Sequence, residues 1–161
     1  YLIKTELDIL KKIGSKIRLF KNKIHIKGPQ KIKNIKNIIT KEYGGFPTDL
    51  APQMMVLLCK ANGTSFITEN IFQGRFLHVM ELQRLGANIT IKDNTAKIIG
   101  NTNFMAAEVM SSDLRASAAL ILAGIVSKGN TIVSRIYHCD RGYENFENKL
   151  KKIGVKIKRL K

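Results

Sequence analysis

Long apolar runs are missing from this sequence of 161 residues, although 44% of the residues are hydrophobic. A helix that crosses a bilayer needs roughly 20 consecutive apolar residues, so we expect no membrane-spanning helix. The N-terminus, Tyr1-Leu2-Ile3-Lys4, has neither an initiator Met nor the pattern of a signal peptide. The chain therefore reads as a soluble piece of a longer protein, with enough residues for one sizeable core.

Cysteine is scarce as well. Cys59 and Cys139 lie far apart, without a CxxC pair or clustered histidines. These spacings do not fit a zinc site, and we expect neither a metal nor another cofactor. Two distant thiols are typical of a reducing compartment, so we expect a cytoplasmic protein.

Acidic residues are few, with 12 Asp and Glu against 28 Lys and Arg, and the net charge is +16. Residues 1–41 carry +10 and residues 149–161 carry +7, whereas the segment between them sums to −1. Such a charge suggests a nucleic-acid-binding module, which we keep as an alternative. No aromatic-lined recognition motif supports it. The many lysines accompany Ile and Asn, so we interpret them as compositional drift on the surface and expect no nucleic-acid partner.

An internal repeat organises the chain. Segments 10–17, 82–89 and 150–157 each read as the last turn of an amphipathic helix, a Gly that ends it, and the start of a strand. After the first two segments, the polar turns Lys21-Asn22 and Asp93-Asn94 lead into a second strand. Each of these two copies therefore predicts a β-hairpin.

Two further blocks recur. In Phe46–Leu50 and Met110–Leu114 a hydroxyl residue and an Asp precede an apolar stretch, which predicts buried helices over about 49–61 and 113–127. Asp49 and Asp113 are then the expected N-caps. The blocks that begin at Gly63 and Gly129 predict strands, and we expect these strands to end at Arg75 and Arg141.

In chain order, one repeat reads strand, buried helix, strand, amphipathic helix and two strands. This predicts an α/β fold of βαβαββ units, of which about two and a third are present. The predicted copies span 1–28 (the tail of a first copy), 29–100 and 101–161, all within one domain. Since the front half of the first copy is missing, we expect uncovered apolar side chains there: Leu2, Ile3, Leu10 and Ile13.

Five side chains occupy equivalent or neighbouring places in the repeats: Asp49, Asp113, Arg75, Arg115 and Arg141. Loops after strands and helix N-termini of repeated units tend to converge, so we expect these groups on one face. Guanidinium groups suit phosphate and carboxylate, and an aspartate among them can remove a proton. We interpret His25 and His78 as structural and Cys139 as a packing residue, and we leave His138 open.

Four motifs carry a resemblance to a known family: residues 44–50, 73–79, 111–118 and 137–144. They closely resemble the UDP-N-acetylglucosamine 1-carboxyvinyltransferases of the enolpyruvyl transferase family. The 5-enolpyruvylshikimate-3-phosphate synthases share the repeat but not these local sequences, and they remain an alternative. The resemblance implies two inside-out α/β barrels of three units each. It also implies transfer of enolpyruvate from phosphoenolpyruvate to the 3-hydroxyl of UDP-N-acetylglucosamine, with release of phosphate, for peptidoglycan synthesis.

The resemblance also implies roles for residues. Asp49 matches the base that contacts the sugar hydroxyl, and Asp113 matches a second acid of the catalytic face. Ile71 and Phe72 match the contact with the UDP-sugar. The arginines match phosphoenolpyruvate ligands (Arg115 and Arg141) and a further basic group (Arg75).

Other working parts of the family belong to segments outside this sequence: a lysine, an asparagine and a loop with a reactive cysteine. We therefore expect the chain to be inactive alone and to need the missing N-terminal part. A third hypothesis is a decaying gene or a purely structural role.

Overall fold

The computed structural model describes residues 2–160, so the first and last residues of the predicted repeat copies, Tyr1 and Lys161, lie outside the described range. The chain forms two compact units. The first comprises Tyr1–Arg75 with Asn88–Thr102, and the second comprises Phe76–Ala87 with Asn103–Lys161. The copy boundaries derived from the sequence remain a prediction.

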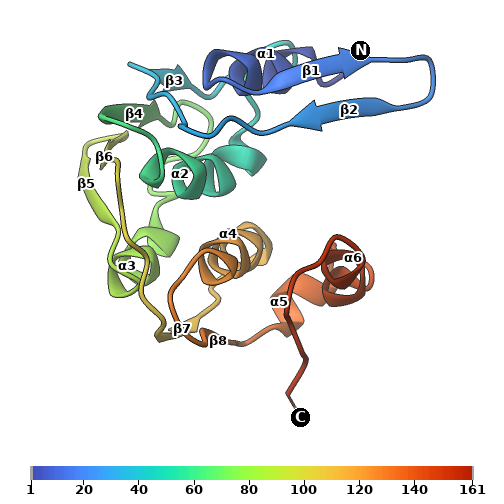
Figure 1. Cartoon of the computed structure of the whole chain (residues 1–161). Coiled ribbons are helices and arrows are strands. Elements are labelled where there is room, and N and C mark those ends of the chain that lie inside the picture. Colours follow the sequence, from blue (N-terminus) through green and yellow to red (C-terminus); the bar gives the residue numbers. More distant parts are fainter. Residues whose placement is uncertain (1, 161) are drawn as a thin grey trace. The chain divides into compact units, whose positions relative to one another are not determined.

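Helices and strands are interspersed along the chain, as expected for an α/β fold (Figure 1). The elements of the first unit are α1 (Lys4–Lys12), β1 (Lys16–Leu19), β2 (Ile24–Lys27), β3 (Ile38–Ile39), the 3₁₀ turn η1 (Thr48–Leu50), α2 (Ala51–Cys59), β4 (Thr64–Thr68), β5 (Asn88–Lys92) and β6 (Thr95–Ile99). Those of the second are α3 (Leu77–Arg84), β7 (Glu108–Met110), α4 (Leu114–Ile125), β8 (Ile132–Ser134), α5 (Tyr137–Asp140) and α6 (Phe146–Lys152).

A four-stranded sheet in the order β3-β4-β6-β5 forms the centre of the first unit. β3 runs parallel to β4, whereas β6 is antiparallel to both β4 and β5. Alternate residues of β4 and β6 are buried, including Ile67 and Ile98, and α2 contacts these two strands. Because α2 is buried on nearly every face, the predicted core helix is confirmed.

The first hairpin, β1–β2, forms at the predicted turn. Leu2 and Ile3, which precede α1, are 83% and 43% exposed, as expected. The expectation was wrong for Ile13, which is buried, and Leu10 is half-buried. Ile13 is covered because the chain returns past it after the hairpin, with the Lys33 N–H donating to the Ile13 carbonyl at 3.0 Å.

The second unit is built around α4, which contacts α3, α5 and β8. β7 and β8 form a short parallel pair. Ile121, Cys139 and Leu150 form a buried cluster between α4, α5 and α6. The strand predicted after Gly154 is absent from the described residues. Val155 and Ile157 there pack against this cluster instead.

The three repeated glycines end their helices as predicted. Gly14, Gly86 and Gly154 have φ values of +109°, +95° and +92°. This left-handed conformation has no steric cost for glycine and closes the last helical turn.

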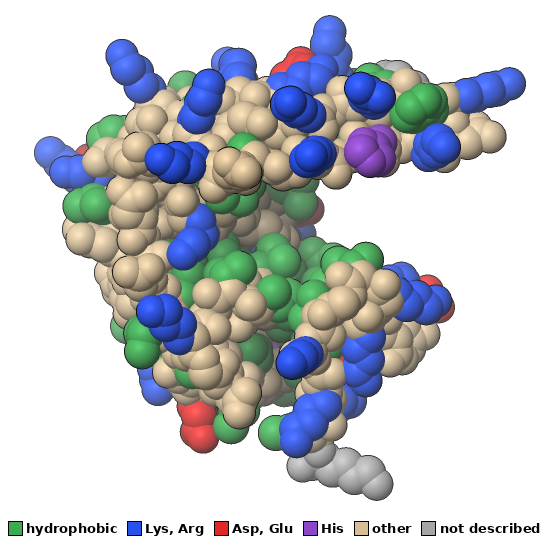
Figure 2. Space-filling view, viewed as in Figure 1, with side chains coloured by type: hydrophobic (Ala, Val, Ile, Leu, Met, Phe, Trp, Pro, Cys, Tyr) green, Lys and Arg blue, Asp and Glu red, His purple; other side chains and the backbone are tan. Residues whose placement is uncertain are grey.

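Among residues 2–160, no helix combines the length and apolar character that a membrane-spanning helix requires. Figure 2 shows Lys and Arg side chains spread over this face, many of them separated by uncharged surface and several close together at the lower right. That distribution fits the interpretation of most lysines as solvated surface groups.

The close approach of β6 to the loop after α2 makes Gly100 a sensitive position. An added Cβ would lie 2.7 Å from the carbonyl oxygen of Gly63 and closer still to that of Ala61. Since backbone atoms cannot rotate away, we expect Gly100→Ala to lower the free energy of unfolding by about 1–3 kcal/mol. Gly28→Ala is the matched control, because its Cβ would meet open space. Urea unfolding followed by circular dichroism checks this, and equal midpoints for the two variants would contradict it.

Candidate active site

Asp49 does not cap a helix, which corrects the expectation from the sequence. It lies inside η1, and neither η1 nor α2 has a side-chain cap at its N-terminus. The Asp49 side chain is 57% exposed, and its Oδ1 lies 3.3 Å from Nη1 of Arg75. The carboxylate is therefore available to solvent and paired with an arginine.

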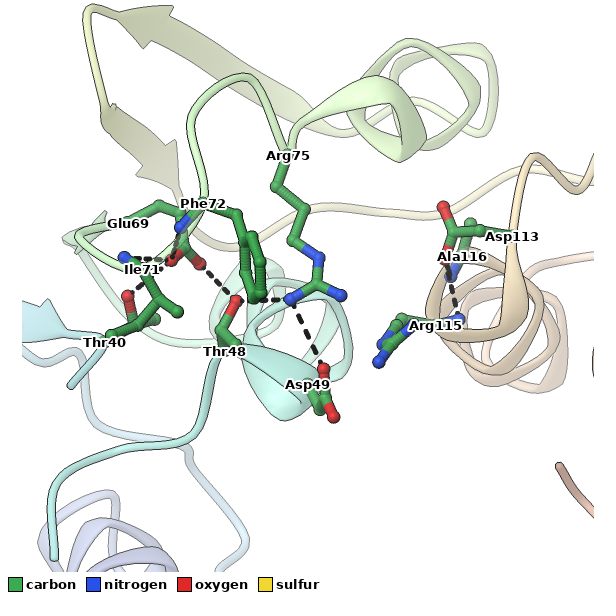
Figure 3. A network of polar contacts seen from close by, with 10 residues as sticks. All are labelled: Thr40, Thr48, Asp49, Glu69, Ile71, Phe72, Arg75, Asp113, Arg115 and Ala116. Carbon is green, nitrogen blue, oxygen red and sulfur yellow. Dashed lines mark hydrogen bonds and ion pairs between the residues drawn. The ribbon is translucent and has the colours of Figure 1, made fainter. Parts of the chain in front are cut away.

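Arg75 is held from three sides (Figure 3). The nitrogen that faces Asp49 also donates to Oγ1 of Thr48 at 2.9 Å. The guanidinium carbon lies 4.5 Å from the centre of the Phe72 ring. Because β4 ends at Thr68, the expectation that Arg75 ends this strand was wrong. Arg75 belongs to the turn that follows.

Glu69 organises this turn, and the sequence did not single it out. Its side chain is buried, with a residue exposure of 4%. Oε1 accepts from Thr40 Oγ1 and from the N–H of Ile71, both at 2.8 Å, and from the N–H of Phe72 at 3.1 Å. Oε2 accepts from Oγ1 of Thr48 at 2.7 Å. The only sign of this role in the sequence is the position of Glu69 directly after a strand, and it is a weak one because a Glu at such a position is usually exposed.

Burial alone would raise the pKa of Glu69. The hydrogen bonds from the hydroxyls of Thr48 and Thr40 and from the backbone of Ile71 and Phe72 outweigh that effect, so the pKa lies below its ordinary value. Glu69 is thus a buried carboxylate that stays ionised at neutral pH.

A pocket of about 520 Å³ lies beside this network in the first unit. It is lined by Asn70, Ile71 and the loop from Thr40 to Gly45. Ile71 and Phe72 are 36% and 52% exposed. Both predicted sugar-contacting residues therefore present apolar surface to solvent, and Ile71 does so at the pocket.

Asp113 does cap its helix, as expected. It is the N-cap of α4, and its Oδ1 accepts from the N–H of Arg115 at 2.8 Å and of Ala116 at 3.0 Å. Burial would raise the pKa of Asp113. The bonds from these two N–H groups and from the Ser112 hydroxyl outweigh burial and hold the pKa below its ordinary value.

The two arginines of the second unit that the sequence predicts as site residues lie in different local structures. Arg115 is the second residue after the cap, in the first turn of α4, and its side chain is half-buried. Arg141 is exposed and ends the short helix α5. The expectation that Arg141 ends a strand was wrong, because β8 stops at Ser134 and Arg135, with φ of +54°, turns the chain into α5.

The cysteines are packing residues. Burial raises the pKa of the Cys59 thiol to about 12. Burial and the charge of Asp140 raise that of Cys139 to about 11. Arg159 binds both oxygens of Asp140, at 2.9 and 2.7 Å. Neither thiol has the low pKa of a nucleophile, which agrees with our interpretation of Cys139.

No group of His, Cys, Asp and Glu within the described residues could hold a metal ion. His138 stacks on Tyr137, with ring centroids 4.3 Å apart. His78 is buried in α3, as expected for a structural histidine.

The structure thus brings Asp49, Arg75 and Phe72 together in the first unit, and Asp113 with Arg115 in the second. The convergence of both groups on one face stays a prediction. Within the first unit, the arrangement offers an exposed carboxylate, a fixed guanidinium group and an open pocket. These groups suit a ligand that carries hydroxyl and anionic groups.

Comparison with known proteins gives a consistent result. Residues 2–150 match the family described as EPSP synthase (3-phosphoshikimate 1-carboxyvinyltransferase). The UDP-N-acetylglucosamine 1-carboxyvinyltransferase of Pelagibacter ubique is 62% identical over 159 residues, which are 99% of this chain and 38% of that protein. The enzyme of the same name from Desulfosudis oleivorans is 49% identical over 98% of this chain and 38% of its own length.

Solved structures agree on the fold. The enolpyruvyl transferase NikO from Streptomyces tendae superposes with a TM-score of 0.89 at 24% identity, over 97% of this chain and 36% of that one. EPSP synthase from Acinetobacter baumannii gives a TM-score of 0.69 at 17% identity, over 97% of this chain and 37% of that one. The predicted fold class, repeated βαβαββ units of an inside-out α/β barrel, is confirmed.

The cap geometry makes a prediction for stability against pH. We expect Asp113→Ala to lower the free energy of unfolding at pH 7 by about 0.5–2 kcal/mol. The folded-state pKa lies below the ordinary value of 3.8. The stabilisation is therefore complete well above pH 4 and is lost as the pH falls through the folded-state pKa.

Urea unfolding at pH 7, 5 and 3 tests this expectation. The difference between the parent and Asp113→Ala should shrink at the lowest pH. Asp8→Ala, which removes an exposed carboxylate paired with Lys11, is the control, with an expected change within about 0.5 kcal/mol. A deficit of Asp113→Ala as large at pH 3 as at pH 7 would rule out the charged cap.

Proposed function

Because the chain belongs to the EPSP synthase family, we propose that it is part of an enolpyruvyl transferase acting on UDP-N-acetylglucosamine. The reaction moves enolpyruvate from phosphoenolpyruvate to the 3-hydroxyl of the sugar and releases phosphate. The names of the relatives that are 62% and 49% identical support this acceptor over 3-phosphoshikimate. The observation that carries the proposal is the contact of Asp49 with Arg75, which joins two of the four motifs.

Asp49 is the proposed base. In the transfer, a bond forms between the sugar oxygen and the central carbon of enolpyruvate, and the bond from that carbon to the phosphate oxygen breaks. The hydroxyl proton must leave as this happens, and a carboxylate within hydrogen-bond reach accepts it. The 57% exposure of Asp49 leaves it accessible to a substrate hydroxyl, and its contact with Arg75 restricts its orientation.

The remaining side chains bind the substrates in this proposal. Ile71, which lines the open pocket of the first unit, and the exposed Phe72 contact the UDP-sugar. Arg115 and Arg141 hold the phosphoenolpyruvate anion, and Arg75 adds fixed positive charge that stabilises the departing phosphate. Asp113 is the second acid of this face, and its cap bonds hold the helical turn that carries Arg115.

The chain spans 38% of the length of the two relatives compared above. We propose that the rest of the protein supplies the second domain, including the lysine, the asparagine and the reactive cysteine of the family. The product is a precursor for peptidoglycan, and the two free thiols fit a cytoplasmic enzyme.

A chimaera tests the function. Residues 2–160 of this chain replace the matched segment of the Pelagibacter ubique relative, with which the identity is 62%. We expect phosphate release that requires both phosphoenolpyruvate and UDP-N-acetylglucosamine. The chain by itself should release none, because the other half of the site is missing. A folded chimaera that uses 3-phosphoshikimate instead would overturn the proposed acceptor.

The role of Asp49 is tested in the same chimaera. We expect Asp49→Ala to lower kcat by about 10²–10⁴-fold, the usual contribution of a general base. Unfolding should change little, since Asp49 caps no helix. Asp8→Ala removes a carboxylate from α1 and should leave kcat unchanged. Turnover of Asp49→Ala within a few-fold of the parent would exclude the catalytic role.

A further inference from the structure

Glu69 holds a buried negative charge whose hydrogen bonds come from two hydroxyls and two backbone N–H groups rather than from a cation. A buried charge is costly unless hydrogen bonds satisfy it, and these four bonds do so. Glutamine, the neutral side chain of the same shape, would carry no charge but could not accept at both positions, because one of its two polar atoms is a donor. Packing alone therefore does not explain why a charged residue occupies this buried position.

The reason lies in the direction of the hydrogen bonds. An ionised carboxylate only accepts, and a threonine hydroxyl has a single proton to donate. Thr40 and Thr48 must therefore both point their protons at Glu69. Each hydroxyl oxygen is then left to accept from another group, and each does so.

The second bond of each hydroxyl connects Glu69 to the site. Oγ1 of Thr48 accepts from Nη1 of Arg75 at 2.9 Å, and Oγ1 of Thr40 accepts from the N–H of Asn70 at 2.9 Å. The same Nη1 contacts Asp49 at 3.3 Å. Glu69 thereby determines which way the Thr48 hydroxyl faces, and that hydroxyl helps to set where the guanidinium group meets the carboxylate (Figure 3).

Backbone hydrogen bonds provide a second connection between Glu69 and Arg75. The N–H groups of Ile71 and Phe72 both donate to Glu69, which closes the turn after β4. This turn carries the Phe72 ring on which the Arg75 guanidinium lies, at 4.5 Å. The two paths link residues 48–49 to residues 70–75, so one carboxylate holds both partners of the Asp49–Arg75 pair.

We propose that Glu69 is the positioning residue of the Asp49–Arg75 pair, acting through the Thr48 hydroxyl and the turn of residues 70–75. It touches no substrate. It keeps the proposed base and the guanidinium group in the geometry used for transfer. This inference rests on the function proposed above and assigns the control of that geometry to a residue outside the four motifs.

The test uses the active chimaera with Glu69→Gln, Thr48→Val and the double variant. In Glu69→Gln the new amide donates towards Thr48, so the hydroxyl is no longer oriented by an acceptor. A displacement of about 1 Å at a reacting group costs up to about 100-fold, so we expect kcat to fall about 10–100-fold. KM for phosphoenolpyruvate should change less than about threefold. Glu108→Gln, at an exposed strand carboxylate, is the matched control and should match the parent.

The double variant separates positioning from simple stability. If Glu69 acts through Thr48, the double variant should lose little more than the larger single loss, because the two changes break one chain of bonds. Thr48→Ser, which keeps the hydroxyl, should recover most of the loss seen in Thr48→Val. The proposal would be overturned if the loss of kcat in the double variant equalled the product of the two single losses. It would also be overturned if Glu69→Gln had a normal kcat per folded molecule and only a lower melting temperature.

Two outcomes distinguish this inference from the proposed function. A folded parent chimaera without turnover contradicts the function itself, whereas an active parent with an unaffected Glu69→Gln contradicts only the role of Glu69. If Glu69→Gln does not fold, the comparison of kcat between Thr48→Val and Thr48→Ser tests the proposal, because both variants keep the Glu69 carboxylate. Equal kcat for these two threonine variants would then overturn the proposal.

Discussion

An acceptor-only carboxylate, buried at the end of β4, is the constraint on which the site of the first unit depends. Glu69 accepts four hydrogen bonds. Two come from the adjacent residues Ile71 and Phe72, and the other two come from Thr40 and Thr48, which are distant in sequence from each other and from Glu69. Its charge orients two hydroxyls, and through them it ties a loop, a 3₁₀ turn and a strand end together. The exposed Asp49 can hold a defined orientation at the surface because this buried group fixes its surroundings.

The repeat copies have kept their helices but have diverged in the use of the aspartate that precedes each one. Asp113 turns its carboxylate back onto the first turn of α4, where backbone N–H groups satisfy it. Asp49 lies within a 3₁₀ turn, so its carboxylate faces outward to Arg75. A group that accepts backbone bonds is held ionised and is a poor proton acceptor, whereas an outward-facing group can meet a hydroxyl. This difference favours Asp49 over Asp113 as the base.

The four motifs and the comparisons point to one chemistry, and the structure adds the arrangement within each unit. Apolar Ile71 lines an open pocket, and the fixed Arg75 lies on the ring of its neighbour Phe72. The thiols, by contrast, are buried and have raised pKa values, so neither fits the reactive cysteine that the resemblance implies. In the proposed function, the chain therefore supplies substrate-binding and proton-accepting groups rather than a nucleophile.

The sequence by itself determined the order of most elements, the two hairpins, the buried helices and the glycine stops, because periodicity and glycine conformation are local properties. It also singled out Asp49 and Arg75 through their motifs. Only the tertiary structure decided that Asp49 leaves its helix uncapped, that Arg141 follows a short helix, and that residues after Gly154 pack as loop. It also revealed Glu69, whose importance comes from Thr40 and Thr48, 29 and 21 residues away in sequence. Contacts of that separation depend on how strands and loops pack, and no local pattern encodes them.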